Sequence, residues 1–262
     1  MAEADPYIFG VSDECQLFYD LVRSAEPEIT AEMRRIADGV GADLIGLENS
    51  VKTGTSVLEK LERKMNRAEA MGRSVSDAEA IRNVSDLIRY TFVCDGKSLA
   101  VIANATARRL EERGFFIYET DNKWLHPSAK TGYRAVHMGV ASKTGELIEI
   151  QFHTKESAEA RSECRNLYAR IREGSSEMTN DEKESLLSEA KAIFESLETP
   201  RNVHEVKEIE IDPAEVLEGI EIRLNPLAGN PEEEEEPEIS ADDLFSAEAL
   251  AKELEKVRNT DS

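Results

Sequence analysis

Two short stretches of the sequence carry polar side chains that could take part in phosphate chemistry. The first reads T-G-Y-R-A-V-H over residues 131–137, and the second reads E-I-Q-F-H-T over residues 149–154. A carboxylate, imidazoles, an amide and a phenol can together hold a metal ion, accept a proton or contact a nucleotide. Their concentration in two neighbouring stretches predicts a phosphate-chemistry site.

The two stretches belong to a predicted β-hairpin. Residues 134–142 read as one strand, a glycine-containing turn follows, and residues 147–153 read as the returning strand. Successive side chains of a strand point to opposite faces, so Glu149, Gln151 and His153 share one face. The apolar side chains between them share the other face. The hairpin therefore predicts one core face and one polar face.

Tyr133 and His137 lie at the mouth of the partner strand, beside this polar face. A lone E-x-Q-x-H pattern is usually a solvated face, and a lone tyrosine next to a glycine is usually a packing or turn residue. The combination of the two patterns favours a site over either of these alternatives.

Cations that could neutralise a triphosphate precede the hairpin. Lys52 and Ser56 flank the start of a predicted helix at residues 55–71, and Lys60 and Lys64 share one face of that helix. Backbone N–H groups and the helix dipole favour an anion at such a helix start. The alternative is a lysine-rich helix face that is simply solvated.

The order of these segments resembles the synthetase domain of the RelA/SpoT family. The carrying motifs are V-K-T-G-T-S-V-L-E-K at residues 51–60, S-D-L-I at residues 85–88, G-Y-R-A-V-H at residues 132–137 and E-I-Q-F-H-T at residues 149–154. The resemblance spans roughly residues 45–172. It implies a nucleotidyltransferase-like core and transfer of pyrophosphate from ATP to the 3′-hydroxyl of a guanosine or adenosine nucleotide, as in (p)ppGpp synthesis.

The resemblance also implies roles for the donor side of the site. Lys52, Ser56, Lys60 and Lys64 would bind the phosphates of ATP. Asp86 and Glu149 would be the catalytic and metal-binding carboxylates. Mg²⁺ is usually held by one or two carboxylates together with substrate phosphates, which makes this pair its expected site. Glu149 would also accept the proton of the acceptor hydroxyl. For Asp86 alone, a turn or a helix cap is the alternative.

On the acceptor side, Tyr133 resembles the family's tyrosine that stacks on the acceptor base. An aromatic ring suits that role because it contacts any base without selecting one. His137 resembles a histidine near the acceptor phosphates, and Gln151 and His153 complete the implied acceptor set.

Several positions depart from the family pattern. Ser50, Thr91, Ala129 and His153 stand where the pattern has basic residues. A catalytically degenerate module that binds a nucleotide or a protein is therefore the first alternative. A toxin that pyrophosphorylates the 3′ end of tRNA and an assembly-type protein acting through its terminal helix are others. Small alarmone synthetases of the stringent response, toxins and phage-associated modules all resemble this domain.

The charge of the chain limits its partners. The 262 residues carry a formal net charge of −22. Residues 201–262 contain 19 acidic and 6 basic residues, a net of −13, which leaves −9 for residues 1–200. Such a charge disfavours nucleic acid, tRNA included, and anionic membranes. The acidic end favours a protein partner, and a homo-oligomer remains open.

The three cysteines have neither a metal-type spacing nor the even count of a disulfide framework, which favours a reducing compartment. No secretory signal and no membrane span are recognisable in the sequence. A cytoplasmic location is expected.

The pattern predicts an α+β fold, with a small mixed β-sheet flanked by helices and a disordered acidic C-terminal tail. The expected strands are residues 42–47, 88–94, 115–120, 134–142, 147–153, 203–211 and 221–224. The expected helices are residues 14–24, 29–39, 55–71, 76–82, 99–113, 156–173, 180–197 and 242–257, with Pro27 separating the first two.

We expect N-terminal helices over residues 1–44 and the synthetase-like domain over residues 45–200. A short β or irregular extension would follow at residues 201–225. Residues 226–262 would form an acidic linker and a terminal amphipathic helix, because five successive glutamates cannot pack into a core.

Overall fold

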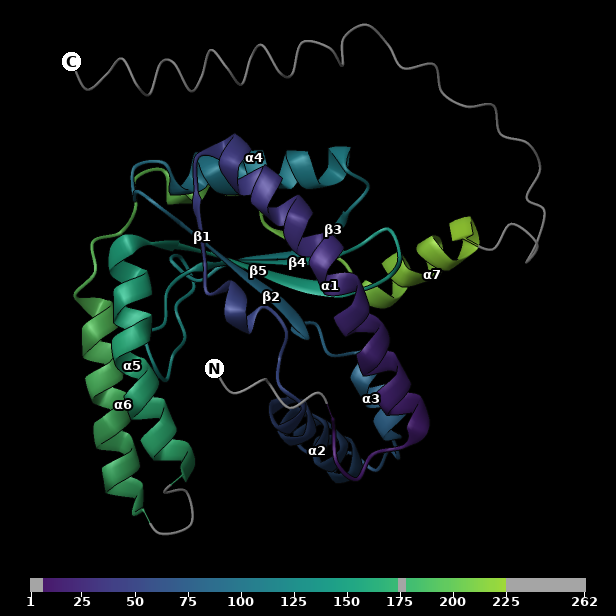
Figure 1. Cartoon of the computed structure of the whole chain (residues 1–262). Helices are drawn as coiled ribbons and strands as arrows, with labels where there is room; N and C mark the ends of the chain where they lie inside the picture. Colours follow the sequence, from purple (N-terminus) through teal and green to yellow (C-terminus); the bar gives the residue numbers. More distant parts are fainter. Residues whose placement is uncertain (1–6, 174–177, 225–262) are drawn as a thin grey trace, which may run out of the picture. The chain divides into compact units, whose positions relative to one another are not determined.

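The computed structural model describes residues 7–173 and 178–224 (Figure 1). In these residues the elements follow in the order α1 (Asp13–Val40), β1 (Asp43–Ile45), α2 (Gly54–Ala70), α3 (Asp77–Arg82), β2 (Ile88–Cys94), α4 (Leu99–Glu112), β3 (Phe116–Asn122), β4 (Val136–Ala141), β5 (Leu147–Thr154), α5 (Lys155–Glu173), α6 (Asn180–Glu195), β6 (Ile209–Glu210) and α7 (Pro213–Leu224). None of the helices in this part of the chain has both the length and the apolar character needed to cross a membrane. The linker and helix predicted for residues 226–262 lie outside the described residues.

The strands of the described residues form one mixed sheet in the order β1-β2-β5-β4-β3-β6. β2 and β5 run parallel, and the other neighbouring pairs are antiparallel. The register places Arg89 opposite Glu149, and Gln151 opposite His137. The predicted α+β class is confirmed, and β4 and β5 are the two strands of the predicted hairpin.

One face of the sheet is apolar and packs against α1 and α4 (Figure 1). Tyr90, Phe92, Ile150 and Phe152 are fully buried in the core. Full burial of a side chain of this kind contributes roughly 1.5–3 kcal/mol. This packing fixes the positions of β2 and β5, and with them the polar side chains that alternate onto the opposite face.

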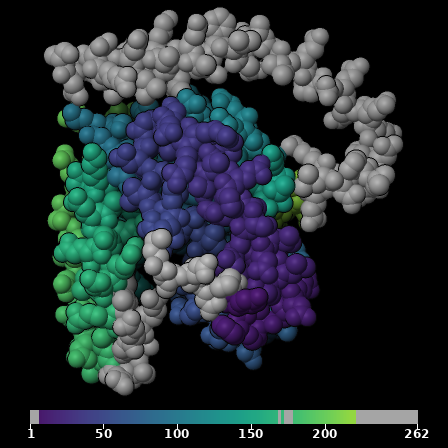
Figure 2. Space-filling model, viewed as in Figure 1, coloured from purple at the N-terminus to yellow at the C-terminus, as the bar shows by residue number. Residues whose placement is uncertain are grey.

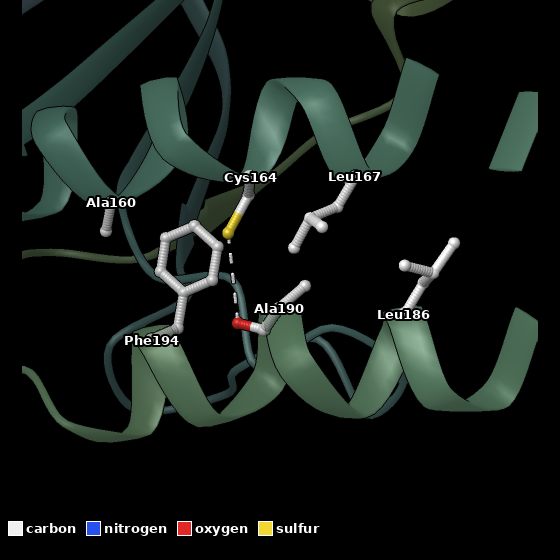
Figure 3. Packing of buried hydrophobic residues seen from close by; sticks show 6 residues of the cluster. All are labelled: Ala160, Cys164, Leu167, Leu186, Ala190 and Phe194. Carbon is white, nitrogen blue, oxygen red and sulfur yellow. Dashed lines mark hydrogen bonds between the residues drawn. The ribbon is translucent and has the colours of Figure 1, made fainter. Parts of the chain in front are cut away.

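Part of that opposite face lies against α5, which contacts β2 and β5 and runs beside α6. In the space-filling view the green surface of α5 and α6 stands beside the purple and blue surface of the N-terminal elements (Figure 2). Figure 3 shows the apolar seam between the two helices, where the ring of Phe194 faces α5 and the thiol of Cys164 points at the carbonyl of Ala190. Tyr133 packs against this seam.

Helix α1 is continuous through Pro27, so the predicted break between two short helices is wrong. A proline inside a helix costs about 3 kcal/mol because it removes a backbone hydrogen bond and crowds the preceding turn. Buried side chains continue on both sides of it, with Val22 before and Ile29, Met33 and Ile36 after. The packing of these side chains against α3, α4 and the strands β1 and β2 outweighs the local penalty.

The strands predicted for residues 203–211 and 221–224 are also wrong, except for the two-residue strand β6. Val203 and Val206 are both buried, a spacing of three that suits the 3-10 turn formed by Val203–Glu205. Helix α7 begins with a proline, a favoured first helical residue, and the Asp212 side chain accepts a hydrogen bond from Ala214 N. Ile220 then packs against the sheet.

Candidate functional site

The first part of the site is built where the chain before α2 joins the start of β2. Val51 pairs with Ile88 in an isolated antiparallel bridge. Backbone hydrogen bonds from Lys52 to Leu87, and from Arg89 to Ser50, extend this pairing. The Tyr19 hydroxyl also donates to the carbonyl of Lys52 at 2.5 Å. This local backbone pairing is what holds the side chain of Lys52 beside Asp86.

Asp86 is surrounded by cations. Lys52 Nζ lies 2.9 Å from Oδ2 of Asp86, and Lys60, on α2, donates to Oδ1. Arg89 Nη2 lies 2.7 Å from the same Oδ2. Burial would raise the pKa of Asp86, but the hydrogen bond from Lys60 and the charge of Lys52 outweigh it and hold that pKa far below its usual range. Asp86 is therefore an ionised, fully partnered carboxylate.

Arg89 joins this cluster to Glu149. Its Nε donates to Oε2 of Glu149, across the parallel pair of β2 and β5 in which the two residues are register partners. Burial alone would lower the pKa of Arg89, but the charges of Glu149 and Asp86 raise it. One guanidinium therefore spans the two carboxylates that the sequence predicts as a metal-binding pair.

Glu149 has further partners on the hairpin. Nδ1 of His137 lies 3.1 Å from Oε1, and Gln151 Nε2 donates to Oε2 at 2.8 Å. Burial would raise the pKa of Glu149, but the hydrogen bond with His137 and the charge of Arg89 lower it to about 2. The Oε1 atom of Gln151 is buried and has no hydrogen-bond partner among the described residues.

A hydrogen-bonded chain continues from His137 into the protein. The Tyr133 hydroxyl lies 3.1 Å from Nε2 of His137 and 3.1 Å from Nε2 of His153. Nδ1 of His153 lies 2.9 Å from the hydroxyl of Ser157. The chain Glu149–His137–Tyr133–His153–Ser157 thus links the polar face of the sheet to the start of α5.

The ionised Glu149 and the neutral His153 limit the possible proton positions along this chain. Glu149 is ionised, so it accepts a hydrogen bond from Nδ1–H of His137. The Tyr133 hydroxyl has a single hydrogen, so it can donate to only one of the two imidazole Nε2 atoms. Burial and the nearby charge of Arg161 lower the pKa of His153 to about 3, so this ring is neutral and carries one N–H.

The structure brings most of the predicted site residues together. Those in one connected network are Lys52, Lys60, Asp86, Glu149, His137, Tyr133, Gln151 and His153. The ring of Tyr133 meets His137, His153 and Phe194 edge-on, with ring centroids 5.3 to 5.8 Å apart. The alternative of a simply solvated polar face does not hold for Gln151 and His153, because both are buried.

Two predicted phosphate-binding residues lie outside that network. The Ser56 backbone N–H and hydroxyl are both bonded to Thr53, whose side chain caps α2. Lys64 donates to the carbonyl of Asn83 at 2.8 Å and lines a separate cavity with Arg67 and Arg73. Burial and the charge of Lys60 lower the pKa of Lys64.

The sequence prediction assigned no role to Arg89, Ser157 or Arg161. Arg161 reaches from α5 to Thr91, with Nη1 3.3 Å from the threonine hydroxyl. The only sequence signal for Arg89 was strand alternation, which puts it on the same face as Thr91. The face of β2 that carries Arg89 lies beside Glu149 only because β2 pairs in parallel with β5.

The Asp86–Glu149 pair does not fit a Mg²⁺ ion in this arrangement. Each of the four carboxylate oxygens has an N–H partner. On Asp86, Lys60 donates to Oδ1 and Arg89 donates to Oδ2; on Glu149, His137 contacts Oε1 and Arg89 donates to Oε2. Magnesium needs free oxygen ligands in near-octahedral geometry at about 2.0–2.1 Å. A metal would therefore have to displace Arg89. The magnesium site expected from the sequence remains a prediction.

No protein-family model matches the chain, and no curated protein matches it. Among solved structures, it is similar to small alarmone synthetase 1 from Bacillus subtilis bound to its product pppGpp, at 17% identity and a TM-score of 0.47, covering 70% of this chain and 94% of that one. It is similar to a GTP pyrophosphokinase family protein from Streptococcus pneumoniae, at 16% identity and a TM-score of 0.46, covering 83% and 99%.

A third similar structure is the complex between the Type VI effector Tas1 and its immunity protein, at 17% identity and a TM-score of 0.43, covering 71% of this chain and 96% of that one. The solved structures to which the chain is similar thus include a small alarmone synthetase and a GTP pyrophosphokinase family protein.

Proposed function

We propose that the chain is a nucleotide pyrophosphotransferase, which moves pyrophosphate from ATP to the 3′-hydroxyl of a purine nucleotide. One observation carries the proposal: Lys52, Lys60 and Arg89 converge on Asp86 immediately beside the Glu149–His137 pair. Cations for a polyphosphate and an ionised carboxylate for a hydroxyl group are thereby placed in one connected network.

The cations form the donor side of the proposed site. Lys52 and Lys60 each use one of three ammonium hydrogens on Asp86, so further hydrogens are available for phosphate oxygens. Their side chains are 17% and 26% exposed, which lets a ligand reach them. Phosphoryl transfer depends mainly on positioning and on neutralising the charge of the phosphates, and this is what converging cations supply.

In the transfer itself, the acceptor hydroxyl oxygen forms a bond to the β-phosphorus of ATP. The bond between that phosphorus and the oxygen bridging it to the α-phosphate breaks, AMP leaves with the electron pair, and the hydroxyl proton is released. Glu149 would accept the hydrogen bond of the acceptor hydroxyl. A carboxylate with a pKa of about 2 is a weak base, so its main contribution would be to orient the hydroxyl.

Residues of the hairpin form the acceptor side. The partly exposed His137 is available to polar groups of a nucleotide. Stacking of Tyr133 on the acceptor base remains a prediction. It requires that a face of the ring be open, since its edges and hydroxyl are engaged by His137, His153 and Phe194.

The test is an incubation of purified protein with labelled ATP and each purine nucleotide, and separately with tRNA. A 3′-pyrophosphorylated product is expected on a purine nucleotide, and Glu149→Gln should abolish it. Glu111→Gln, an exposed position on α4, is the matched control and should retain activity. The absence of product on every acceptor would overturn the proposal, and a product on tRNA alone would change the acceptor class.

A second candidate function is nucleotide binding without turnover. It is favoured by the fact that Asp86 and Glu149 already have N–H partners on each of their oxygens. Calorimetry separates the two functions: nucleotide binding without any product supports the second, and turnover eliminates it. A protein partner that binds through residues 226–262 is a further proposal, tested by deleting those residues and measuring partner binding.

A further inference from the structure

The most informative contact outside the expected chemistry is made by Arg89. Its guanidinium lies between Asp86 and Glu149, bonded to one oxygen of each. The contact arises from the backbone, because Arg89 and Glu149 are register partners on parallel strands, while Asp86 lies two residues before the start of β2. The position between two carboxylates is where a divalent cation would otherwise be expected.

The charges around Arg89 support its role as the resident cation. Lys52, Lys60 and Arg89 carry three positive charges against the two negative charges of Asp86 and Glu149, a net of +1. Without Arg89 this group would be neutral. The arginine thus converts a balanced set of residues into one that attracts an anion.

An arginine at this position is difficult for a metal ion to displace. Its guanidinium is not deprotonated in proteins, so a metal could enter only by breaking two charge-assisted hydrogen bonds. Two of its five N–H groups are used by these contacts, and the side chain is 31% exposed. The remaining N–H groups can bind phosphate oxygens, and a guanidinium matches the geometry of phosphate well.

We propose that Arg89 takes the place of the divalent cation between Asp86 and Glu149, so that the phosphates of a nucleoside triphosphate bind here without a metal ion. The proposal deepens the proposed function, on which it rests for the class of ligand. It makes Arg89 a phosphate-binding residue, and it makes Asp86 and Glu149 the residues that position it.

The first experiment uses a metal alone. Mn²⁺ is titrated into the full-length protein, and the free ion is followed by its electron paramagnetic resonance signal. Wild type should show only the weak background binding of an acidic chain. Arg89→Gln should gain a site at least roughly tenfold tighter than this background. Asp86→Asn added to Arg89→Gln should remove the gained site. Tight binding by wild type that is lost in Asp86→Asn would overturn the proposal.

The second experiment uses a non-hydrolysable ATP analogue, with affinity measured by calorimetry in EDTA and in Mg²⁺. Wild type should bind with affinities that agree within about threefold in the two buffers. Arg89→Gln should lose roughly tenfold or more in EDTA, as expected for a lost charge-assisted contact, and Mg²⁺ should restore part of the loss. Arg63→Gln, an exposed arginine on α2, is the matched control and should behave as wild type.

Arg89→Lys is a second variant, which tests the same contact if the glutamine variant misfolds. It keeps the charge but cannot bond to both carboxylates. It should show an intermediate loss of affinity in EDTA. Wild-type binding that requires Mg²⁺ overturns the role of Arg89 while leaving the proposed function standing. Metal-independent binding of the analogue, without any transfer product from ATP, overturns the proposed function alone. Failure of the analogue to bind in either buffer overturns both.

Discussion

The hydroxyl group of Tyr133 lies 3.1 Å from Nε2 of His137 and makes an equal contact with His153. This relationship joins the partly exposed Glu149–His137 pair to a fully buried histidine. The ionised Glu149 accepts from His137 at the outer end of this chain. Replacing Tyr133 should therefore change the hydrogen bonding of both histidines.

Tyr133→Phe should lower the free energy of unfolding by about 1–3 kcal/mol, because it leaves the buried Nε2 of His153 without its partner. Urea unfolding followed by circular dichroism measures the change. Tyr7→Phe, at a tyrosine that is 61% exposed, is the matched control and should have little effect. Equal stability of Tyr133→Phe and wild type would show that the hydrogen-bonded chain contributes nothing to folding.

Stability should fall as the pH is lowered below about 6.5, because His153 is neutral in the folded protein. Its folded pKa of about 3 is below its ordinary value of 6.5, so the unfolded chain takes up a proton first. The loss should be on the order of 1 kcal/mol per pH unit across this window. His153→Gln, which does not titrate, should flatten the curve between pH 6.5 and 5, whereas the exposed His126→Gln should not.

Protonation of Glu149 should cause a second loss of stability, at lower pH than the first. Its folded pKa of about 2 is below the ordinary value of 4.5, so its stabilisation is present above pH 4.5 and disappears as the pH falls toward 2. Glu149→Gln should remove this step while leaving the one due to His153 in place. Unfolding curves at pH 5, 4 and 3 test the separation, and an unchanged acid limb in Glu149→Gln would contradict it.

Gly139 allows the ring of Tyr118 to lie against the sheet. A Cβ atom at position 139 would be only 2.4 Å from that ring, which is itself held by Leu147 and Ile220. Gly139→Ala should therefore destabilise the protein by roughly 1–3 kcal/mol. Gly219→Ala, in a helix with nothing within 4 Å of the new atom, should instead stabilise it by about 0.5–1 kcal/mol. Thermal unfolding of the two variants measures the contrast.

The sequence predicted the parts of the site that depend on local pattern. Alternation along the hairpin placed Glu149, Gln151 and His153 on one face, and the structure joins all three to one network. Arg89 could not be assigned in this way. Its role arises because β2 pairs in parallel with β5, and this pairing joins strands that are distant in the sequence.

The dependence on contacts between distant parts of the sequence also explains the errors in the predicted fold. Pro27 predicts a helix break from local preference, but the buried stripe of α1 continues through it because the helix packs against α3, α4 and the strands β1 and β2. Residues 221–224 alternate like a strand, yet they continue a helix that begins at Pro213. In each case packing against a distant element overrides the local pattern.

Asp86→Asn tests whether Asp86 restrains the cations or serves chiefly as a metal ligand. The change leaves Lys52, Lys60 and Arg89 without their shared counter-charge, so the unfolding free energy should fall by roughly 1–3 kcal/mol in a phosphate-free buffer. Inorganic pyrophosphate can replace the missing negative charge and should raise the unfolding midpoint of Asp86→Asn more than that of wild type. Asp43→Asn, on the edge strand β1, is the matched control and should respond to pyrophosphate as wild type does. If pyrophosphate stabilises wild type and Asp86→Asn equally, the anion does not bind to these cations, and the donor side of the proposed site must lie elsewhere.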